Sequence, residues 1–466
     1  MLLISYHIMN DKKELFENTP VTKAILTLSV PTIISQLISV IYNIADTFYV
    51  GRTGNPYMIA GVSVSLPLFL MTICIANLFG IGGGSLISRM MGAGKEEQAK
   101  NVSSGSFYGA LVFSLLYSLI IYIFMDGLLK VLGVSEDTVT FAVQYTVYVV
   151  VLGTPFVVLS AVVAHFLRNA GYSNIASYGL SGGGILNMIL DPLFMFIVFP
   201  KGQEVLAAAA ATLLSNIAAF IYLTLMLVRI SGASPLSISP AYLSGVKKQH
   251  VKGILSVGVP SAVLPGLFDV ANIVINSSMS AHGDLQLAAM GIVMKIERIP
   301  NAIGIGISMG MLPLVAYNFS SGNHDRMKKV IRTARRMGVI VAIICVLLLS
   351  LFAPALCGIF LDTSAQAEAA SATLLFATAF LRFRCLASPF QFLNYHSSYC
   401  MQAMGDGKST TIHAVIRIIG LYIPLMYILD RAMGQNGLAL ALPLGEALAD
   451  IVAILLLNRI PAMKKA

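Results

Sequence analysis

Residues 177–199 read SYGLSGGGILNMILDPLFMFIVF, a run long and apolar enough to cross a lipid bilayer as one helix. The run carries a single charged side chain, Asp191, and Asn187 lies four residues before it. Residues four apart share one face of a helix. A carboxylate at membrane depth is costly and is typical of transport pathways and ion sites. The stretch therefore predicts that Asn187 and Asp191 belong to a cation site in a membrane transporter.

Asp191 also has a second interpretation. Because Pro192 follows it, the carboxylate could cap the second half of a broken helix, with proline at the first helical position. Discontinuous helices also build ion sites in transporters, so the two interpretations are compatible. Both stay open at the level of the sequence.

The composition places the whole chain in a membrane. Of its 466 residues 57% are hydrophobic and 11% are charged, whereas soluble domains have about a quarter of their residues charged. The apolar runs are continuous instead of alternating, which predicts an all-α polytopic membrane protein and excludes a barrel. The net charge of +9 does not indicate a nucleic-acid partner, because the basic residues lie in short loops between apolar runs.

The cysteines and the N-terminus add little. The five cysteines have neither disulfide nor metal-site spacing, so no zinc site is expected. The opening residues show no cleavable signal, and either Met1 or Met9 fits as the start of the chain.

Twelve segments are expected to span the membrane, separated by clusters of Gly, Pro, Asn and charged residues. Their approximate ranges are 24–49, 58–86, 104–125, 138–165, 177–199, 205–229, 254–279, 286–316, 331–357, 369–396, 409–430 and 436–458.

The loop Lys and Arg residues are distributed unevenly between the two sides of the membrane. If the N-terminus is cytoplasmic, most of them fall on the inner side, among them Arg168 at the end of the fourth segment. The outer side then holds only Arg52, Lys130, Lys201 and Arg431. Because positive residues favour the cytoplasmic side, we expect a multi-pass protein of the cell (inner or plasma) membrane with both termini inside.

The sequence contains an internal repeat. SVPTIISQL from Ser29 resembles GVPSAVLPG from Gly258, and the segment ending at Val102 matches the segment ending at Val330. Each half holds six spans, and an even number gives both halves the same orientation. We therefore expect two parallel six-helix repeats around a central cavity. The expected divisions are a cytoplasmic segment 1–23, an N-terminal lobe 24–230, a cytoplasmic linker 231–253, a C-terminal lobe 254–459 and a tail 460–466.

The spans of the first half contain two acids, Asp46 and Asp191, and no basic residue at a similar depth. Together with Asn187 and Thr212 they lie about 9–15 Å below the expected outer surface, at 1.5 Å per residue. Two carboxylates and two neutral oxygens suit a hard monovalent cation or a proton shared between the acids. For Thr212, a hydroxyl bonded to its own helix is the alternative. Gln36 and Asn43 could line the same cavity or join helices.

The spans of the second half contain charges of both signs. This mixture suggests a paired network that is structural or controls a gate, and the alternative is a substrate site. Asp269 and Glu297 are candidate contacts for a cationic substrate or a proton, and Arg298 and Arg382 are candidates for the cavity or gate. The full set comprises Asp269, Glu297, Glu446, Asp450, Lys295, Arg298, Arg382, Arg384 and Arg417.

Three stretches resemble the multidrug and toxic compound extrusion (MATE) family. They are VPTIISQLISVIYNIADTFYVGR at 30–52, GGGSLISRMMGAG at 82–94 and NMILDPLFMF at 187–196. The resemblance implies export of amphipathic, often cationic drugs by alternating access, driven by H⁺ or Na⁺. It further implies a coupling-cation site, a possible Na⁺ site, at Asp46, Asn187, Asp191 and Thr212. It would match an acid of the seventh span to Asp269, whereas the tenth span has Arg382 and Arg384 where some members place an acid.

Other classes of protein fit less well. Gly407-Lys408-Ser409 lacks the earlier glycine of a phosphate loop, so no nucleotide is expected. No metal cluster or nucleophile–base pair indicates an enzyme. A flippase for lipid-linked oligosaccharides or lipids is the main alternative, since basic residues of the second half could bind phosphate. The expected partners are small-molecule drugs, organic cations and membrane lipid, with no cofactor beyond the coupling ion and no obligate protein partner.

Overall fold

The computed structural model describes residues 13–361 and 367–464, so the two candidate starts, Met1 and Met9, lie outside the described residues. Within the described part, eleven helices are long and apolar enough to cross a membrane. A twelfth span is formed by Val139–Leu152 and Thr154–Asn169, which meet at a bend of 42°. This arrangement confirms the predicted all-α polytopic fold.

The first lobe contains the first six spans and is followed by a linker. Its elements are α2 (Val21–Gly51), α3 (Pro56–Gly92), α4 (Glu96–Val131), α5 (Val139–Tyr145), the π-helical segment η1 (Thr146–Leu152), α6 (Thr154–Asn169), α7 (Ser173–Leu193), the π-helical segment η2 (Phe194–Val198) and α8 (Glu204–Ile230). The linker forms the short helices η3 (Ser231–Ala233) and η4 (Pro240–Gly245).

The second lobe contains the other six spans. Its elements are α9 (Lys248–Ser280), α10 (Asp284–Ile296), α11 (Arg298–Ser320), α12 (His324–Leu351), α13 (Ala353–Gly358), α14 (Ala367–Arg384), η5 (Cys385–Ala387), α15 (Ser388–Ala403), α16 (Gly407–Val415), the π-helical segment η6 (Ile416–Tyr422), α17 (Ile423–Met433), α18 (Gln435–Arg459) and α19 (Pro461–Lys464). Helix α9 begins at Lys248, within the segment that was expected to be linker.

Local signals explain where several spans begin. The side chain of Asn55 accepts a hydrogen bond from the backbone nitrogen of Tyr57 at the start of α3. At the start of α12, Asn323 accepts one from the backbone nitrogen of Arg326. Such caps satisfy backbone donors that the first helical turn leaves unpaired. These two spans therefore start at polar residues that flank the apolar runs.

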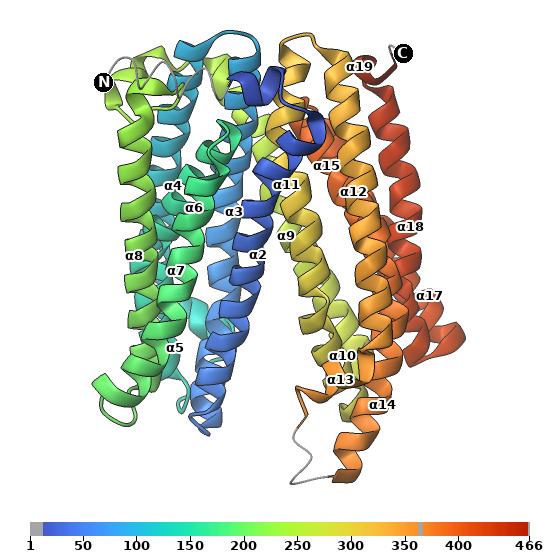
Figure 1. Ribbon diagram of the computed structural model, residues 1–466. Coiled ribbons are helices and arrows are strands. Elements are labelled where there is room, and N and C mark those ends of the chain that lie inside the picture. Colours follow the sequence, from blue (N-terminus) through green and yellow to red (C-terminus); the bar gives the residue numbers. More distant parts are fainter. Residues whose placement is uncertain (1–12, 362–366, 465–466) are drawn as a thin grey trace.

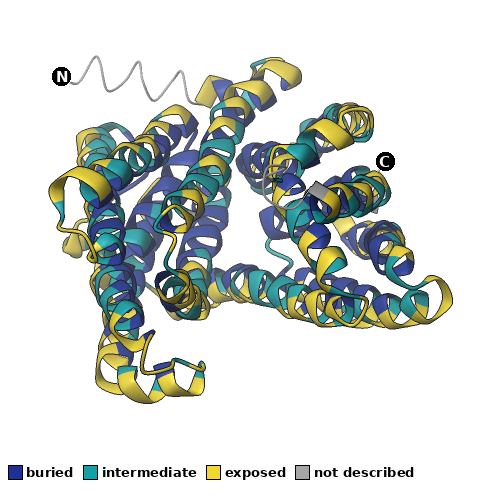
Figure 2. Ribbon diagram, turned by 90° about the horizontal axis from the view of Figure 1, so that it is seen from below, coloured by how far each residue is buried: buried dark blue, intermediate teal, exposed yellow. Residues whose placement is uncertain are grey.

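The two lobes stand side by side, and the axes of their long helices are roughly aligned (Figure 1). Large aliphatic side chains on the outward faces are exposed, among them Ile123 and Leu347. Seen from the end opposite the termini, exposed residues lie at the periphery of both helix groups and buried residues lie within them (Figure 2). Exposed aliphatic faces of this extent are stable in contact with lipid.

The lobes meet closely at the end that carries the termini. A Cβ atom added to Gly258 of α9 would collide with the carbonyl oxygen of Leu78 on α3, and one added to Gly82 would collide with the carbonyl oxygen of Ile254. Gly310 of α11 lies equally close to Ser29 of α2. Glycines allow membrane helices to approach until their backbones touch. We call these α3–α9 and α2–α11 contacts the seam.

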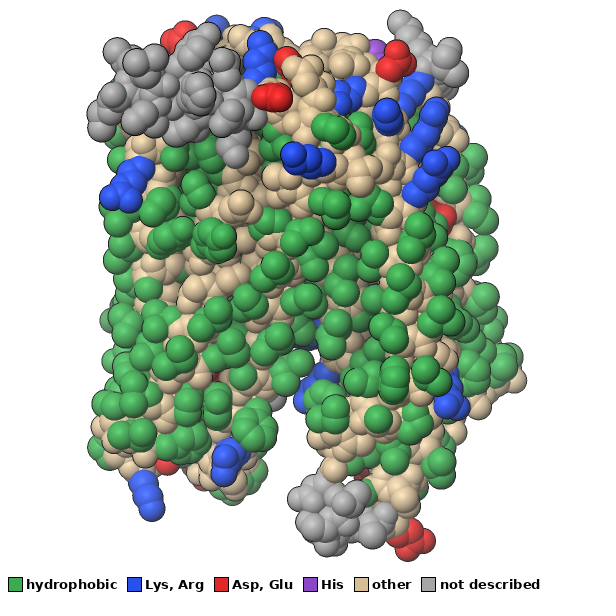
Figure 3. Space-filling model, in the orientation of Figure 1, with side chains coloured by type: hydrophobic (Ala, Val, Ile, Leu, Met, Phe, Trp, Pro, Cys, Tyr) green, Lys and Arg blue, Asp and Glu red, His purple; other side chains and the backbone are tan. Residues whose placement is uncertain are grey.

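At the opposite end the lobes diverge. Figure 3 shows a hollow between them there, with Lys or Arg side chains at its wall. A cavity of about 500 Å³ extends into the first lobe and is lined by α2, α3, α5, η1, α6, α7 and α8, with Arg298 and Met309 contributed by the second lobe. The predicted central cavity is therefore closed by the seam at one end and lies beside an opening at the other.

We expect Gly258→Ala to lower the free energy of unfolding by about 2 kcal/mol, because the new methyl group forces the α3 and α9 backbones apart. The measurement is the unfolding midpoint of the purified protein in detergent. Gly266→Ala is the matched control, because it lies on the same helix and its added Cβ has no neighbour within 4 Å. Equal midpoints for the two variants would contradict the role of the seam.

Candidate functional site

The fifth and sixth spans bring three of the predicted residues into contact. The amide nitrogen of Asn187 on α7 donates to the Asp191 carboxylate at 3.0 Å and to the Thr212 hydroxyl of α8 at 3.3 Å. The i, i+4 spacing on α7 places the first pair on one face, as predicted. Because the amide nitrogen makes both bonds, the amide oxygen remains as a neutral acceptor.

Asp46 on α2 belongs to the same region. It lines the 500 Å³ cavity together with Asn187 and Thr212, and α2 packs directly against α7. One carboxylate oxygen of Asp46 is buried without a hydrogen-bond partner, and so is the second oxygen of Asp191, whose residue is 0% exposed. Buried carboxylate oxygens of this kind need a cation or a proton. The residue set fits a small hard cation or a shared proton.

The interpretation of Asp191 as a helix cap is wrong. Helix α7 continues through Asp191 and Pro192 to Leu193 and then into η2, so the carboxylate lies inside the helical segment. Proline has no backbone N–H and displaces the carbonyl four residues earlier, which accounts for the change of helical pitch beside it. The Asp191 carboxylate therefore does not cap a helix, and it accepts the hydrogen bond of Asn187.

The hydroxyl of Thr212 accepts a bond from Asn187, while its neighbour on the same helix face behaves differently. Ser215 also lines the cavity, yet its hydroxyl donates to the carbonyl oxygen of Ala211 on its own helix at 2.8 Å. Thr212 therefore bonds to the side chains around Asp191, whereas Ser215 bonds to the backbone of its own helix.

The structure distributes the other predicted cavity residues among three environments. Gln36, Asn43 and Arg298 line the cavity. The amide nitrogen of Gln36 lies 3.2 Å from the sulfur of Met309, which joins the two lobes, and that of Asn43 donates to the carbonyl oxygen of Ser39 at 2.6 Å. Asp269 is half-buried on α9 beside Asn272, whose amide nitrogen is 3.5 Å from its carboxylate.

Glu297 and Arg382 lie away from that cavity. Glu297 is buried and makes a two-pronged ion pair with Arg384, with N···O distances of 2.7 and 2.9 Å. Arg382 is exposed, and its Nε donates to the carbonyl oxygen of Ser350 at 3.3 Å. The first is therefore part of the packing of the second lobe, and the second lies on its surface.

A second buried ion pair completes the charge network of this lobe. The Nε and Nη2 atoms of Arg417 donate to the two carboxylate oxygens of Glu446, both at 2.8 Å. The same carboxylate accepts a bond from the amide nitrogen of Asn394 at 2.8 Å. The guanidinium of Arg417 stacks between the rings of Phe268 and Tyr395, 4.8 Å from each centroid. The predicted pairing is thus present for two acids and two bases of the set, and such pairs are costly to break.

The sequence interpretation missed one basic residue of the cavity. Arg168 was assigned to an inner loop, but it is 4% exposed within α6 and lines the cavity, where it donates to the hydroxyl of Ser35 at 3.1 Å. His165, one turn earlier, lines the cavity as well. Their i, i+3 spacing at the end of an apolar run was the available signal.

The comparisons with known proteins follow the same division into lobes. A family model described as MatE matches residues 31–193 and 260–428, one match in each lobe. The multidrug export protein MepA of Staphylococcus aureus (strain MRSA252) is 30% identical over 441 residues, which are 95% of this chain and 94% of the relative.

Solved structures of MATE proteins share the fold of this chain. A MATE protein in complex with MaL6 has a TM-score of 0.90 at 25% identity, covering 97% of this chain and 99% of that chain. An outward-facing multidrug resistance MATE family transporter of the MOP superfamily has a TM-score of 0.88 at 25% identity, covering 97% and 98%. The chain therefore belongs to the MatE family of multi-pass membrane transporters and is not an enzyme.

Proposed function

We propose that this protein exports amphipathic, often cationic compounds and that entry of H⁺ or Na⁺ at Asp46, Asn187, Asp191 and Thr212 drives the export. The observation that carries the proposal is a pair of carboxylates, each with one buried oxygen that lacks a partner in the described structure. The name of the staphylococcal relative, a multidrug export protein, supports the substrate class.

The cavity wall suits organic cations of varied shape. It combines the aromatic rings of Tyr42, Phe69 and Tyr145 with the flexible side chain of Met309 and the carboxylate of Asp46. Aromatic faces attract cations, and methionine adapts to different ligand shapes. A bound drug cation and a coupling ion would both be attracted by the same acids, so that each lowers the affinity for the other.

Coupling requires that the ion bind one conformation of the lobes more tightly than the other. The seam closes the end that carries the termini, and the hollow opens at the other end (Figure 3). With the termini in the cytoplasm, as the Lys and Arg bias favours, this state would admit an ion from outside and release a drug there. Neutralising the two acids would lower drug affinity in this state.

Asp46→Asn is expected to reduce ion-driven efflux of a fluorescent organic cation from proteoliposomes by at least roughly tenfold, because the neutral amide neither attracts the ion nor releases a proton. The protein should remain folded, as judged by its unfolding midpoint.

Asp126→Asn is the matched control, since it removes an exposed carboxylate from α4 of the same lobe. Full coupled efflux by Asp46→Asn, or an equal loss in both variants, would contradict the proposal.

Thr212→Val is expected to weaken the sodium dependence of efflux by roughly tenfold if sodium is the coupling ion, because the group loses one oxygen ligand. Ser215→Ala should leave it unchanged, because that hydroxyl is bonded to its own helix. The measurement is the initial efflux rate against sodium concentration at constant pH. Unchanged sodium dependence in Thr212→Val would indicate that protons alone are coupled.

A phosphate-bearing lipid-linked substrate is the second candidate, favoured by the positions of Arg168 and the exposed Arg298 on the cavity wall. The drug-export proposal expects Arg298→Gln to retain efflux of the organic cation. Loss of transport in Arg298→Gln together with full transport in Asp46→Asn would favour the lipid-linked substrate.

A further inference from the structure

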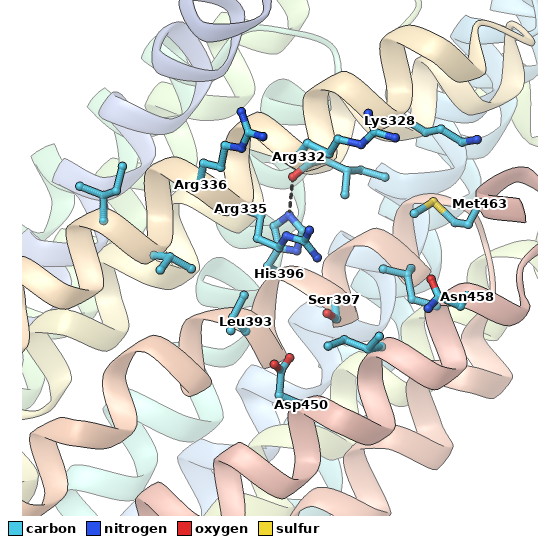
Figure 4. Close-up of a pocket in the computed structure, with 15 residues that line it drawn as sticks. Lys328, Arg332, Arg335, Arg336, Leu393, His396, Ser397, Asp450, Asn458 and Met463 are labelled. Carbon is cyan, nitrogen blue, oxygen red and sulfur yellow. Dashed lines mark hydrogen bonds between the residues drawn. The ribbon is translucent and has the colours of Figure 1, made fainter. Parts of the chain in front are cut away.

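We propose that a second cavity, between α12, α15 and α18, binds the phosphate of an anionic membrane lipid. The cavity has a volume of about 690 Å³ and lies at the end of the molecule that carries the C-terminus. Figure 4 shows four basic side chains of α12 along one wall, with His396 and Ser397 of α15 and Asp450 of α18 facing them. The basic residues are Lys328, Arg332, Arg335 and Arg336.

The charges of this cavity are not balanced by the protein. Asp450 is the only carboxylate among the lining residues, and among the described residues none of the four basic groups forms an ion pair within 4 Å. Lys328 is 8% exposed as a whole residue, and the three arginines are exposed. Four basic side chains beside one carboxylate attract an anionic ligand, and arginines bind a phosphate with charge-assisted hydrogen bonds.

The first lobe fills the corresponding position with its own chain. There the linker crosses α4: the hydroxyls of Ser103 and Ser104 donate to the carbonyl oxygens of Ser237 and Ser239, both at 2.8 Å. Leu236 is fully buried and belongs to the core cluster of the first lobe that also contains Val162, Val163 and Leu227. The linker thus seals this end of the first lobe with apolar packing.

The repeat shows what replaces that packing in the second lobe. Counting on from the match of Val102 with Val330, Ser104 corresponds to Arg332 and Phe107 to Arg335. The match of LVRI at 227–230 with LNRI at 457–460 places Asp450 at the position of Phe220. Three positions that are uncharged in the first lobe, two of them phenylalanines, are therefore charged in the second. Among the described side chains of the short α19, Met463 lines this cavity.

The surface beside the cavity favours a lipid over a free anion. Ile340 of α12 and Ile454 of α18 line the cavity and are also 59% and 42% exposed. Exposed aliphatic residues continue from them along both helices, at Leu347 and Ile451. Figure 3 shows Lys and Arg side chains gathered at this end above a broad hydrophobic band. A phosphodiester head bound by the arginines would leave its acyl chains against this band.

The test is a titration of the purified protein in detergent with cardiolipin, phosphatidylglycerol or phosphatidylcholine, read as the shift of the unfolding midpoint. The anionic lipids should raise the midpoint more than phosphatidylcholine does. Arg332→Gln/Arg335→Gln should require roughly tenfold more anionic lipid for the same shift, because two phosphate contacts are lost. Both arginines are exposed, so the core of the lobe is unchanged.

Lys248→Gln/Lys252→Gln is the matched control, because it removes two exposed charges from the start of α9 outside the cavity, and it should behave as wild type. Asp450→Asn removes the only acid of the cavity and should lower the amount of anionic lipid required. Equal lipid responses of the arginine variant and wild type, or an equal response to phosphatidylcholine, would overturn the proposal. A response to inorganic phosphate as large as the response to lipid would replace the lipid with a free anion.

Discussion

Backbone contact between α3 and α9 and between α2 and α11 is the constraint on which the rest of the structure depends. Gly82, Gly258 and Gly310 bring these helices so close that no side chain fits between them. The two lobes are thereby joined at one end and separate at the other. As a result, the cavity wall that carries Asp46 and Asn187 lies beside an opening at the far end. Under the proposed alternating access, this seam would have to part before the cavity could open on its side.

Within this frame the two lobes bury charge in different ways. In the second lobe Glu297 and Glu446 are each held by an arginine with two hydrogen bonds. Paired charges of this kind fix the packing of α11, α14, α18 and η6 and resist change. In the first lobe Asp46 and Asp191 have no basic partner within ion-pair distance among the described residues. In the proposed function an ion or proton from outside neutralises these acids, so the first lobe would be the half that responds to the ion.

Much of the fold and part of the site could be predicted from the sequence. The number of spans and the repeat follow from apolar periodicity, and the Asn187–Asp191 contact follows from spacing on one helix. The partners Arg384 and Glu297 are 87 residues apart, and their pairing depends on how helices rotate, which spacing does not determine. Arg168 was misplaced because it lies close to a loop, and Pro192 made a continuous helical span look broken. The cavity between α12, α15 and α18 could not be predicted either, because the sequence does not show that the linker packs on the first lobe.

The central claim is that the acid group of the first lobe couples an ion to export. It is tested most directly by efflux of a fluorescent organic cation from proteoliposomes under separately imposed sodium and pH gradients. The account predicts that one gradient drives efflux by the wild-type protein and that Asp191→Asn, although folded, loses this response. Undiminished gradient-driven efflux by Asp191→Asn would contradict it.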